Sequence, residues 1–412
     1  MIHATTTLLA EAADAVELPP VAESRLRSYL DEIGSLLGNK KRKEAFALYA
    51  CGLYGEGDRK SVEPIAARAC GAAEATEAMH AKLLYFLGRS SWEDTPVRQF
   101  AADYALAEMV EQEPIRTWIV DDTGFLKQGK ESPGVQRQYT GTAGKTANCQ
   151  IGVSLVLAND QVELPVDFRL YLPESWTEDR ARCEKAHIPE DVGYAPKWRL
   201  ALDMIDAAIE AKMPTGVVLA DSGFGHAGPF RDRLNALGLS YAVEIKSNTV
   251  VRRVLTDGAS GAEQSVKKLG RRLKSKFRTV TWREGTRRAL QSRFARVRVV
   301  DGRKDSPAQW LLIEWPDGES GPTKFVLTTM SKRISLKQMV RTFKSRWRVE
   351  RSYEDLKGEL GLDHYEGRSF VGWHHHVTVV LCCYAFLVAE RSRSFPPSGP
   401  WSRSASAYAD AA

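Results

Sequence analysis

The sequence lacks the features of a secreted, membrane-spanning or disulfide-stabilised protein. Its six cysteines form no CxxC pair and no framework spacing, which favours a reducing compartment and argues against a cysteine-built zinc site. The N-terminus has no basic region followed by a long apolar stretch, so no secretory signal is predicted. The longest apolar run, residues 377–389, is too short to span a bilayer and indicates a buried helix. We therefore expect a cytoplasmic protein with no membrane partner.

A nucleotide-binding phosphate loop is also absent. The stretch from Gly141 to Thr146 reads Gly-Thr-Ala-Gly-Lys-Thr, but the loop needs a glycine five residues before its Gly-Lys pair, and that position is Tyr139. Residues 148–157 then predict a strand, whereas a phosphate loop leads into a helix whose N-terminus holds the phosphate. The sequence predicts no ATPase and no bound nucleotide.

The chain has an excess of basic residues, and they are clustered in one segment. The chain has 412 residues, of which 43% are hydrophobic, enough for two or three domains with buried cores. Its net charge is +6, and the segment from Lys267 to Lys304 holds fifteen Lys or Arg residues against two acids. This density favours a polyanionic partner, with a solvated basic face as the alternative. The candidate residues for binding such a partner, DNA among them, are Lys267, Lys268, Arg271 and Arg272.

The residue pattern changes several times along the chain and indicates several domains. Apolar residues recur at helical spacing before Pro114, and β-prone runs alternate with helical patterns after it. The expected order is a disordered tail (1–20), a helical domain (21–113), the first part of an α/β core (114–247), a basic β-rich insertion (248–334), the completion of the core with C-terminal helices (335–391) and a second disordered tail (392–412).

Two predicted strands end in aspartate. Thr117–Val120 is followed by Asp121-Asp122, and the apolar run Val217–Ala220 is followed by Asp221. Turn chemistry explains each aspartate taken singly. In open α/β sheets, however, functional residues collect at the carboxyl ends of strands, so these carboxylates would meet if their strands are neighbours.

A third carboxylate lies in the stretch from Phe343 to Lys357. Read as one helix, this stretch places Arg346, Glu350 and Lys357 on one face. Such a charged helix face is usually just solvated. Together with the two upstream aspartate positions, however, Glu350 could be the third carboxylate of a metal site. Phosphodiester chemistry uses two divalent ions about 3.5 to 4 Å apart, and carboxylates from separate elements are the oxygen ligands that Mg²⁺ prefers.

Together these residues resemble the motifs of bacterial insertion-sequence transposases of the DDE class. Arg346, Glu350 and Lys357 fall in register with the Tyr-Arg-Glu-Lys signature of one branch, and Phe343 stands at the tyrosine position. Three further stretches are similar to the surroundings of the two catalytic aspartates in that class, namely residues 121–130 and 136–141 for the first and residues 217–225 for the second.

The resemblance implies a ribonuclease H-like fold. For this chain we expect a ribonuclease H-like mixed α/β sheet flanked by helices, together with an all-α N-terminal domain and a β-rich insertion before the last catalytic helix. It implies that Asp122, Asp221 and Glu350 bind two Mg²⁺ ions, with Mn²⁺ as a substitute. Asp122 is preferred because it directly precedes the threonine of the family pattern, and Asp121 stays the alternative.

The resemblance further implies that the helical domain 21–113 binds DNA, that the core beginning at residue 114 is catalytic, and that Arg346 and Lys357 contact DNA phosphates. The partners would be double-stranded DNA, both terminal inverted repeats and target, and a second copy of the chain in a homodimer. Two alternative functions remain open: another metal-dependent nuclease with the same fold, and a non-catalytic DNA-binding protein derived from a transposase. We also expect Trp347 to pack in the core, and the run His374 to His376 to have surface and core roles rather than to bind metal.

Overall fold

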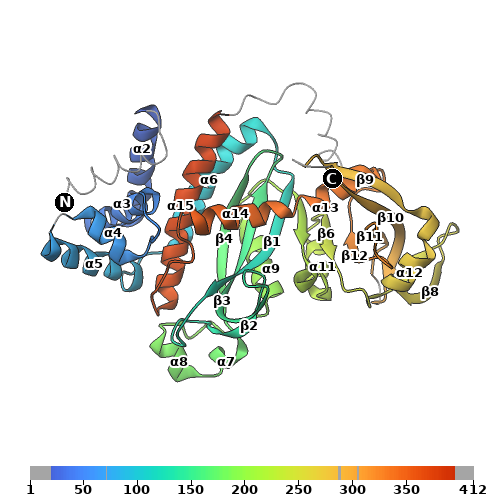
Figure 1. The fold of residues 1–412 in the computed structure, drawn as a ribbon, viewed down its shortest axis with the longest axis horizontal. Coiled ribbons are helices and arrows are strands. Elements are labelled where there is room, and N and C mark those ends of the chain that lie inside the picture. Colours follow the sequence, from blue (N-terminus) through green and yellow to red (C-terminus); the bar gives the residue numbers. More distant parts are fainter. Residues whose placement is uncertain (1–19, 71, 286–288, 304–305, 395–412) are drawn as a thin grey trace. The chain divides into compact units, whose positions relative to one another are not determined.

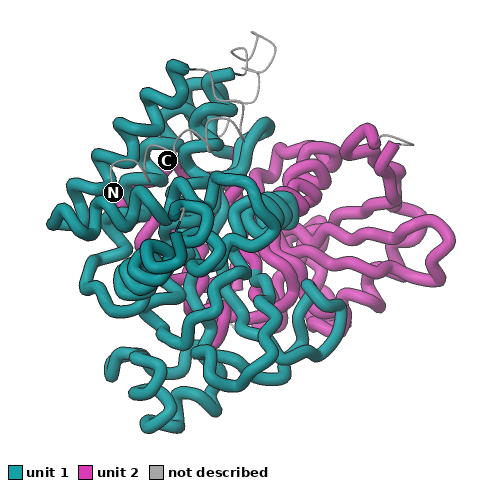
Figure 2. Tube along the Cα trace, turned by 60° about the vertical axis from the view of Figure 1, so that its left-hand side comes forward, with its two compact units in different colours: residues 1–115, 122–195, 350–412 teal, residues 116–121, 196–349 magenta. Residues whose placement is uncertain are grey.

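The computed structural model describes residues 20–70, 72–285, 289–303 and 306–394. Apart from residues 20 and 392–394, the two predicted tails lie outside this range. The chain forms two compact units (Figure 2). Unit 1 comprises residues 1–115, 122–195 and 350–412, and unit 2 comprises residues 116–121 and 196–349. One strand, β1 (Thr117–Leu126), and one helix, α14 (Trp347–Gly358), each contribute residues to both units.

Unit 1 begins with helices, as the sequence predicts. Residues 20–112 form α2 (Pro20–Leu36), α3 (Lys40–Tyr54), α4 (Val62–Ala69), α5 (Ala73–Gly88) and α6 (Asp94–Gln112). The start of α3 is set by Asn39, whose side chain accepts a hydrogen bond from the Arg42 amide at 2.9 Å, a helix-capping arrangement.

The long helix α15 (Phe370–Ser394) is the core of unit 1 (Figure 1). It packs against α3, α5, α6 and the strand β4 (Glu163–Tyr171). Its length and apolar composition would suit a membrane span, but 83% of that apolar window is buried in the protein. Buried Arg98 of α6 joins these elements, because its guanidinium contacts Asp167 of β4 at 3.0 Å and the Thr378 hydroxyl of α15 at 3.3 Å.

The strands of unit 1 form an antiparallel set. β3 (Lys145–Ala158) pairs with β2 (Gln136–Thr140) on one side and with β4 on the other. β3 and β4 form a hairpin, at whose turn the Asn159 side chain accepts a hydrogen bond from the Val162 amide at 2.9 Å. Two short helices, α7 (Glu174–Thr177) and α8 (Arg180–Lys185), follow β4.

Unit 2 contains a large mixed sheet. The first half of β1 lies parallel to β5 (Val217–Ala220), which lies parallel to β6 (Tyr241–Glu244). Helices α9 (Lys197–Glu210), α10 (Ser222–Gly225) and α11 (Gly228–Ala236) connect and flank these strands. These elements agree with the predicted strand, helix and strand pattern, and β5 is buried as its apolar sequence requires.

The predicted insertion continues the sheet of unit 2. Its last strand, β12 (Lys324–Thr328), pairs antiparallel with β6, so the insertion shares hydrogen bonds with the strands of the core. The order then runs through β11 (Gln309–Trp315), β10 (Leu290–Asp301), β7 (Val250–Val254) and β8 (Ser260–Ser265), with β9 (Arg278–Arg283) also on β10. The sequence did not predict β7, β8 or helix α12 (Val266–Arg272).

The fold class is confirmed: the protein is mixed α/β, with a large mixed sheet and flanking helices. The segment 335–391, predicted to complete the core, begins with α13 (Leu336–Lys344). Its first turn carries a capping box, in which Ser335 and Gln338 each bond to the other's backbone amide.

Candidate active site

The two aspartate-bearing strands are neighbours. β1 and β5 run parallel, and their register places Val120 opposite Ala220. Asp121 and Asp221 each follow at the next position, so the structure confirms that these strand positions are adjacent. One detail of the prediction is wrong, because β1 does not end at the aspartates but continues to Leu126. Phe125 explains the continuation: its side chain is 1% exposed and packs edge-on against Trp373, so the strand buries apolar surface beyond the carboxylates.

Asp121 is engaged in an ion pair. Its carboxylate accepts a hydrogen bond from Nη1 of Arg346 at 2.6 Å, and the two side chains are 15% and 21% exposed. A charge-assisted contact of this kind, partly shielded from water, is stronger than a surface ion pair. Arg346, predicted from the sequence as a phosphate contact, therefore also has an internal partner. Successive strand residues point to opposite faces, so Asp121 and its neighbour Asp122 have different surroundings.

Asp221 sits at a strand-to-helix turn. Its side chain caps α10 and accepts a hydrogen bond from the Gly223 amide at 2.8 Å, which fixes the orientation of the carboxylate. The close packing behind it depends on Gly225, where a Cβ atom would lie 2.3 Å from the Glu244 carbonyl oxygen of β6. The local sequence thus holds Asp221 at the carboxyl end of a buried strand.

The residues that follow Asp122 form a polar cluster with Lys357. The ammonium of Lys357 donates to the Thr123 hydroxyl at 2.8 Å, to the Gly124 carbonyl at 2.8 Å and to the Thr142 hydroxyl at 3.3 Å. Burial lowers the pKa of Lys357, and the nearby carboxylate of Asp363 opposes that shift.

The sequence did not predict this Lys357 cluster. Thr142 comes from the glycine-rich stretch that fails as a phosphate loop, and in the structure that stretch is the turn between β2 and β3. Gly124 is needed because Thr140 of the same turn approaches closely: a Cβ atom on Gly124 would lie 2.0 Å from the Thr140 hydroxyl oxygen. The pairs Thr123-Gly124 and Gly141-Thr142 can be seen in the sequence, but the contact between Gly124 and Thr142 cannot.

Glu350 lies in the first turn of α14 and is exposed. A carboxylate at this place is favoured by the partial positive charge of the helix N-terminus. The opposite face of the helix is fixed in unit 1, where Leu356 is fully buried and the Tyr353 hydroxyl lies 2.6 Å from the Ser154 hydroxyl of β3. This packing presents Glu350 and Glu354 to solvent.

The stretch from Phe343 to Lys357 is not one helix, which corrects the prediction. α13 ends at Lys344 and α14 begins at Trp347. The Ser345 hydroxyl bonds to the Thr342 carbonyl at 2.7 Å, a local side-chain contact that competes with the helical pattern. Across the break the backbone tightens, because the Val349 amide bonds to the carbonyl three residues before it.

The two aromatic residues of this stretch differ in burial. Phe343, at the tyrosine position of the signature, is 4% exposed and packs in unit 2. The prediction that Trp347 packs in the core is wrong: it is half-buried, and the guanidinium of Arg283 lies over its ring at 4.1 Å from the centroid.

The predicted metal site rests on donor chemistry. Across the described ranges, no group of three or more His, Cys, Asp or Glu side chains lies close enough together to hold a metal ion. Asp122 and Glu350 belong to unit 1 and Asp221 to unit 2. Three carboxylates are the hard oxygen donors that suit Mg²⁺, so the donor set fits the implied ion, and the ligand assignment stays a prediction.

The run from His374 to His376 packs within unit 1. His375 lies between two backbone carbonyls, with Nδ1 at 2.8 Å from the Leu87 oxygen and Nε2 at 3.0 Å from the Trp92 oxygen. His376 is fully buried, and burial lowers its pKa to about 4. The core part of the prediction is confirmed, whereas none of the three is exposed.

The predicted DNA-binding residues of the insertion form a continuous exposed surface on α12. Val266 and Leu269 are buried and hold the helix to unit 2, while the basic side chains face outward around a hollow of about 490 Å³. We call this surface the α12 patch; it consists of Lys267, Lys268, Arg271 and Arg272.

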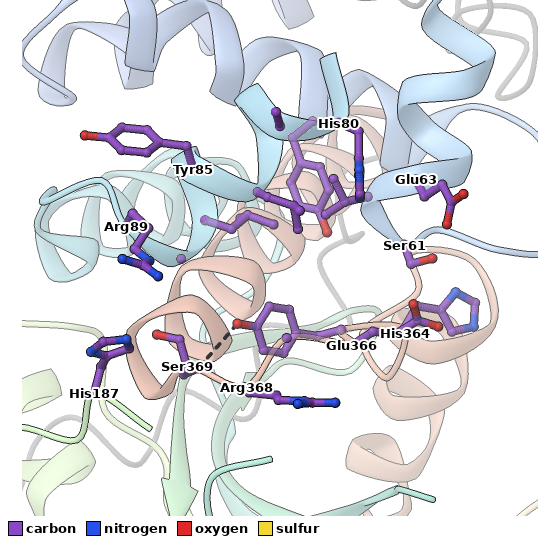
Figure 3. A pocket seen from close by; sticks show the side chains of 18 of the residues that line it. Ser61, Glu63, His80, Tyr85, Arg89, His187, His364, Glu366, Arg368 and Ser369 are labelled. Carbon is purple, nitrogen blue, oxygen red and sulfur yellow. Dashed lines mark hydrogen bonds between the residues drawn. The ribbon is translucent and has the colours of Figure 1, made fainter. Parts of the chain in front are cut away.

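Unit 1 contains a larger pocket, of about 640 Å³, lined by α4, α5 and the segment that precedes α15. Arg89, His187 and Arg368 line it together with Glu63 and Glu366, as Figure 3 shows. This lining mixes both signs of charge, unlike the α12 patch. Charge alone therefore gives the pocket no preference for a polyanion.

Comparison with known proteins gives the family. The sequence matches the family described as DDE superfamily endonuclease over residues 32–305. The chain belongs to the DDE superfamily of endonucleases. It is also 26% identical over 337 residues to the probable transposase for insertion sequence element IS701 from Microchaete diplosiphon, an alignment that covers 80% of each chain. The resemblance to DDE-type insertion-sequence transposases is thus confirmed, as is the expectation of a DDE-class enzyme. The individual site residues stay predictions.

Proposed function

We propose that this chain is the transposase of a bacterial insertion sequence. It binds the terminal inverted repeats of its element, cleaves a DNA strand at each end with Mg²⁺, and joins the freed end to target DNA. The observation that carries the proposal is the parallel pairing of β1 with β5, which puts two aspartate-bearing positions side by side in a chain that belongs to the DDE superfamily.

Asp122, Asp221 and Glu350 would hold two Mg²⁺ ions, or Mn²⁺ in their place. Bound there, the ions would neutralise charge on the attacking and leaving oxygens of the phosphodiester. In the first step water attacks the phosphorus atom at the element's end, the bond to the 3′ oxygen breaks, and a 3′-hydroxyl and a 5′-phosphate result. In the second step that hydroxyl attacks a target phosphodiester, so one bond forms as another breaks.

The proposal keeps Asp122 as the ligand because it directly precedes the threonine of the family pattern. Asp121, which accepts a hydrogen bond from Arg346, would position that guanidinium. Arg346, whose Nη1 donates to Asp121, would bring its positive charge to a DNA phosphate at the catalytic strand. Lys357 would contribute charge to a phosphate from its place beside Thr123.

The α12 patch is proposed to hold the DNA backbone. Four exposed cations on one short helix suit phosphates spaced along a strand, and their contribution would depend on salt. The enzyme would act in the cytoplasm as a homodimer on DNA, because two element ends require two active sites.

The test uses the DNA that flanks the coding sequence. Matching inverted repeats there would supply the substrate, and the wild-type protein should bind and nick them in Mg²⁺. Asp122→Ala, Asp221→Ala and Glu350→Ala should each bind the repeats but not cut them. A variant that still cuts at the wild-type rate would show that its residue is misassigned.

A further inference from the structure

The side chain of Thr142 joins the turn between β2 and β3 to β1. Thr142, in the middle of the turn, lies beside Gly124: the Gly124 amide donates to the Thr142 hydroxyl at 3.2 Å, and that hydroxyl donates to the Gly124 carbonyl at 3.3 Å. The same hydroxyl receives the third donor of Lys357. One hydroxyl of the turn thus donates to the strand β1 and accepts from both β1 and the helix α14.

Lys357 is held by neutral oxygens. An ammonium has three donors, and these go to the hydroxyls of Thr123 and Thr142 and to the Gly124 carbonyl. Its partners therefore fix its position without cancelling its charge. A free lysine side chain has four rotatable carbon bonds, so without such partners the charge would sample many positions.

The position so fixed is next to the proposed metal ligand. Thr123 and Gly124, which receive two of the Lys357 donors, directly follow Asp122 in β1. All of these residues belong to unit 1.

We propose that Thr142 is a positioning residue for DNA cleavage, which anchors the charge of Lys357 on β1 beside Asp122. The inference rests on the proposed function, since it assigns Thr142 to the same site. It gives the Gly-Thr-Ala-Gly turn a role other than nucleotide binding: the turn presents a hydroxyl to the catalytic strand. Thr142 itself is exposed at the turn, so its replacement removes little buried surface.

The experiment compares Thr142→Val, which keeps the shape and removes the hydroxyl, with Thr142→Ser, which keeps the hydroxyl. Loss of a group that orients a metal site typically costs about 10- to 100-fold in activity. We expect the Val variant to lose about that factor in the single-turnover rate of repeat-end cleavage in Mg²⁺, with DNA affinity within about twofold of wild type. The Ser variant should recover most of the rate. Thr146→Val, on the exposed part of β3, is the matched control and should cleave normally.

A second readout does not depend on cleavage. Acylation of Lys357 by a small activated ester, followed by mass spectrometry of its peptide, should be faster in Thr142→Val than in wild type or Thr142→Ser. Equal labelling and equal cleavage in the Val variant and wild type would overturn the inference. A third outcome combines faster labelling in the Val variant with a wild type that never cuts repeat DNA. In that case Lys357 is anchored as described, but the proposed function is wrong, and so is the role of Thr142 in cleavage.

Discussion

The two adjacent aspartates of β1 should respond differently to the same change. Asp121→Asn keeps an oxygen that accepts from Arg346 at 2.6 Å but removes the negative charge, while Asp122→Asn removes a proposed ligand. A hydrogen bond to a charged partner is worth about 1.5 to 3 kcal/mol net and a neutral one about 1 kcal/mol. Because the pair is only 15% and 21% exposed, we expect Asp121→Asn to lower the free energy of unfolding by about 1 kcal/mol.

The DNA cleavage rates of these two variants should differ more than their stabilities do. Metal ions contribute several kcal/mol to such transition states, so Asp122→Asn should lower the cleavage rate by at least about 10³-fold. Asp121→Asn disturbs a residue that positions Arg346, and its rate should fall by no more than about 100-fold. Single-turnover cleavage of end-labelled repeat DNA measures both rates, and urea denaturation measures stability.

A double-mutant cycle with Arg346→Gln isolates the pair. Asp121 and Arg346 should show a coupling energy near 1 kcal/mol in stability. If Asp121→Asn abolishes cleavage and Asp122→Asn does not, Asp121 is the ligand and the assignment of Asp122 is refuted.

Three further outcomes follow from other parts of the structure. Replacing all four cations of the α12 patch by Gln should reduce the slope of log affinity against log salt by up to about 3 to 4, and an unchanged slope would make the patch a solvated face. Gly124→Ala should cost about 1 to 3 kcal/mol of stability because its Cβ meets Thr140, whereas Gly129→Ala, with open space around it, should not; equal urea midpoints would contradict the packing argument. Burial would raise the pKa of Asp301, but hydrogen bonds from Arg303 outweigh it and hold that pKa at about 2, below the ordinary 3.8. The lowered pKa contributes about 2 kcal/mol to the free energy of unfolding above pH 4, and this contribution is lost as the pH falls towards 2. Asp301→Asn should therefore flatten the plot of stability against pH between pH 4 and pH 2. An identical plot for the variant and the wild type would refute this assignment.

Local sequence patterns predicted much of the α/β framework. The apolar run before Asp221 has no polar residue to face water, so a buried strand was the natural interpretation, and β5 is buried. The ends of elements were harder to predict. Asp121-Asp122 resembles a turn in sequence, yet β1 runs on because Phe125 is buried by α15, a helix more than 240 residues later.

The candidate site was predicted as a set of residues but not as a set of contacts. Arg346 and Lys357 were identified as cations near a catalytic carboxylate, and the structure gives each an internal partner on β1. These partners are separated from them by 225 and 234 residues in sequence, a distance over which no periodicity carries information. The break at Ser345 was missed for a different reason: a single serine carries no helix-ending signal comparable to proline or glycine.

Transposition differs from simple nuclease action in its second step, and that step is the most direct test of the central claim. The measurement supplies a pre-cleaved repeat end bearing a 3′-hydroxyl, a supercoiled target plasmid and Mg²⁺, and counts joined products by sequencing the junctions. The account predicts junctions with wild-type protein and none with Glu350→Gln. Repeat-end cleavage by the wild type without any joined product would contradict it and identify a nuclease instead.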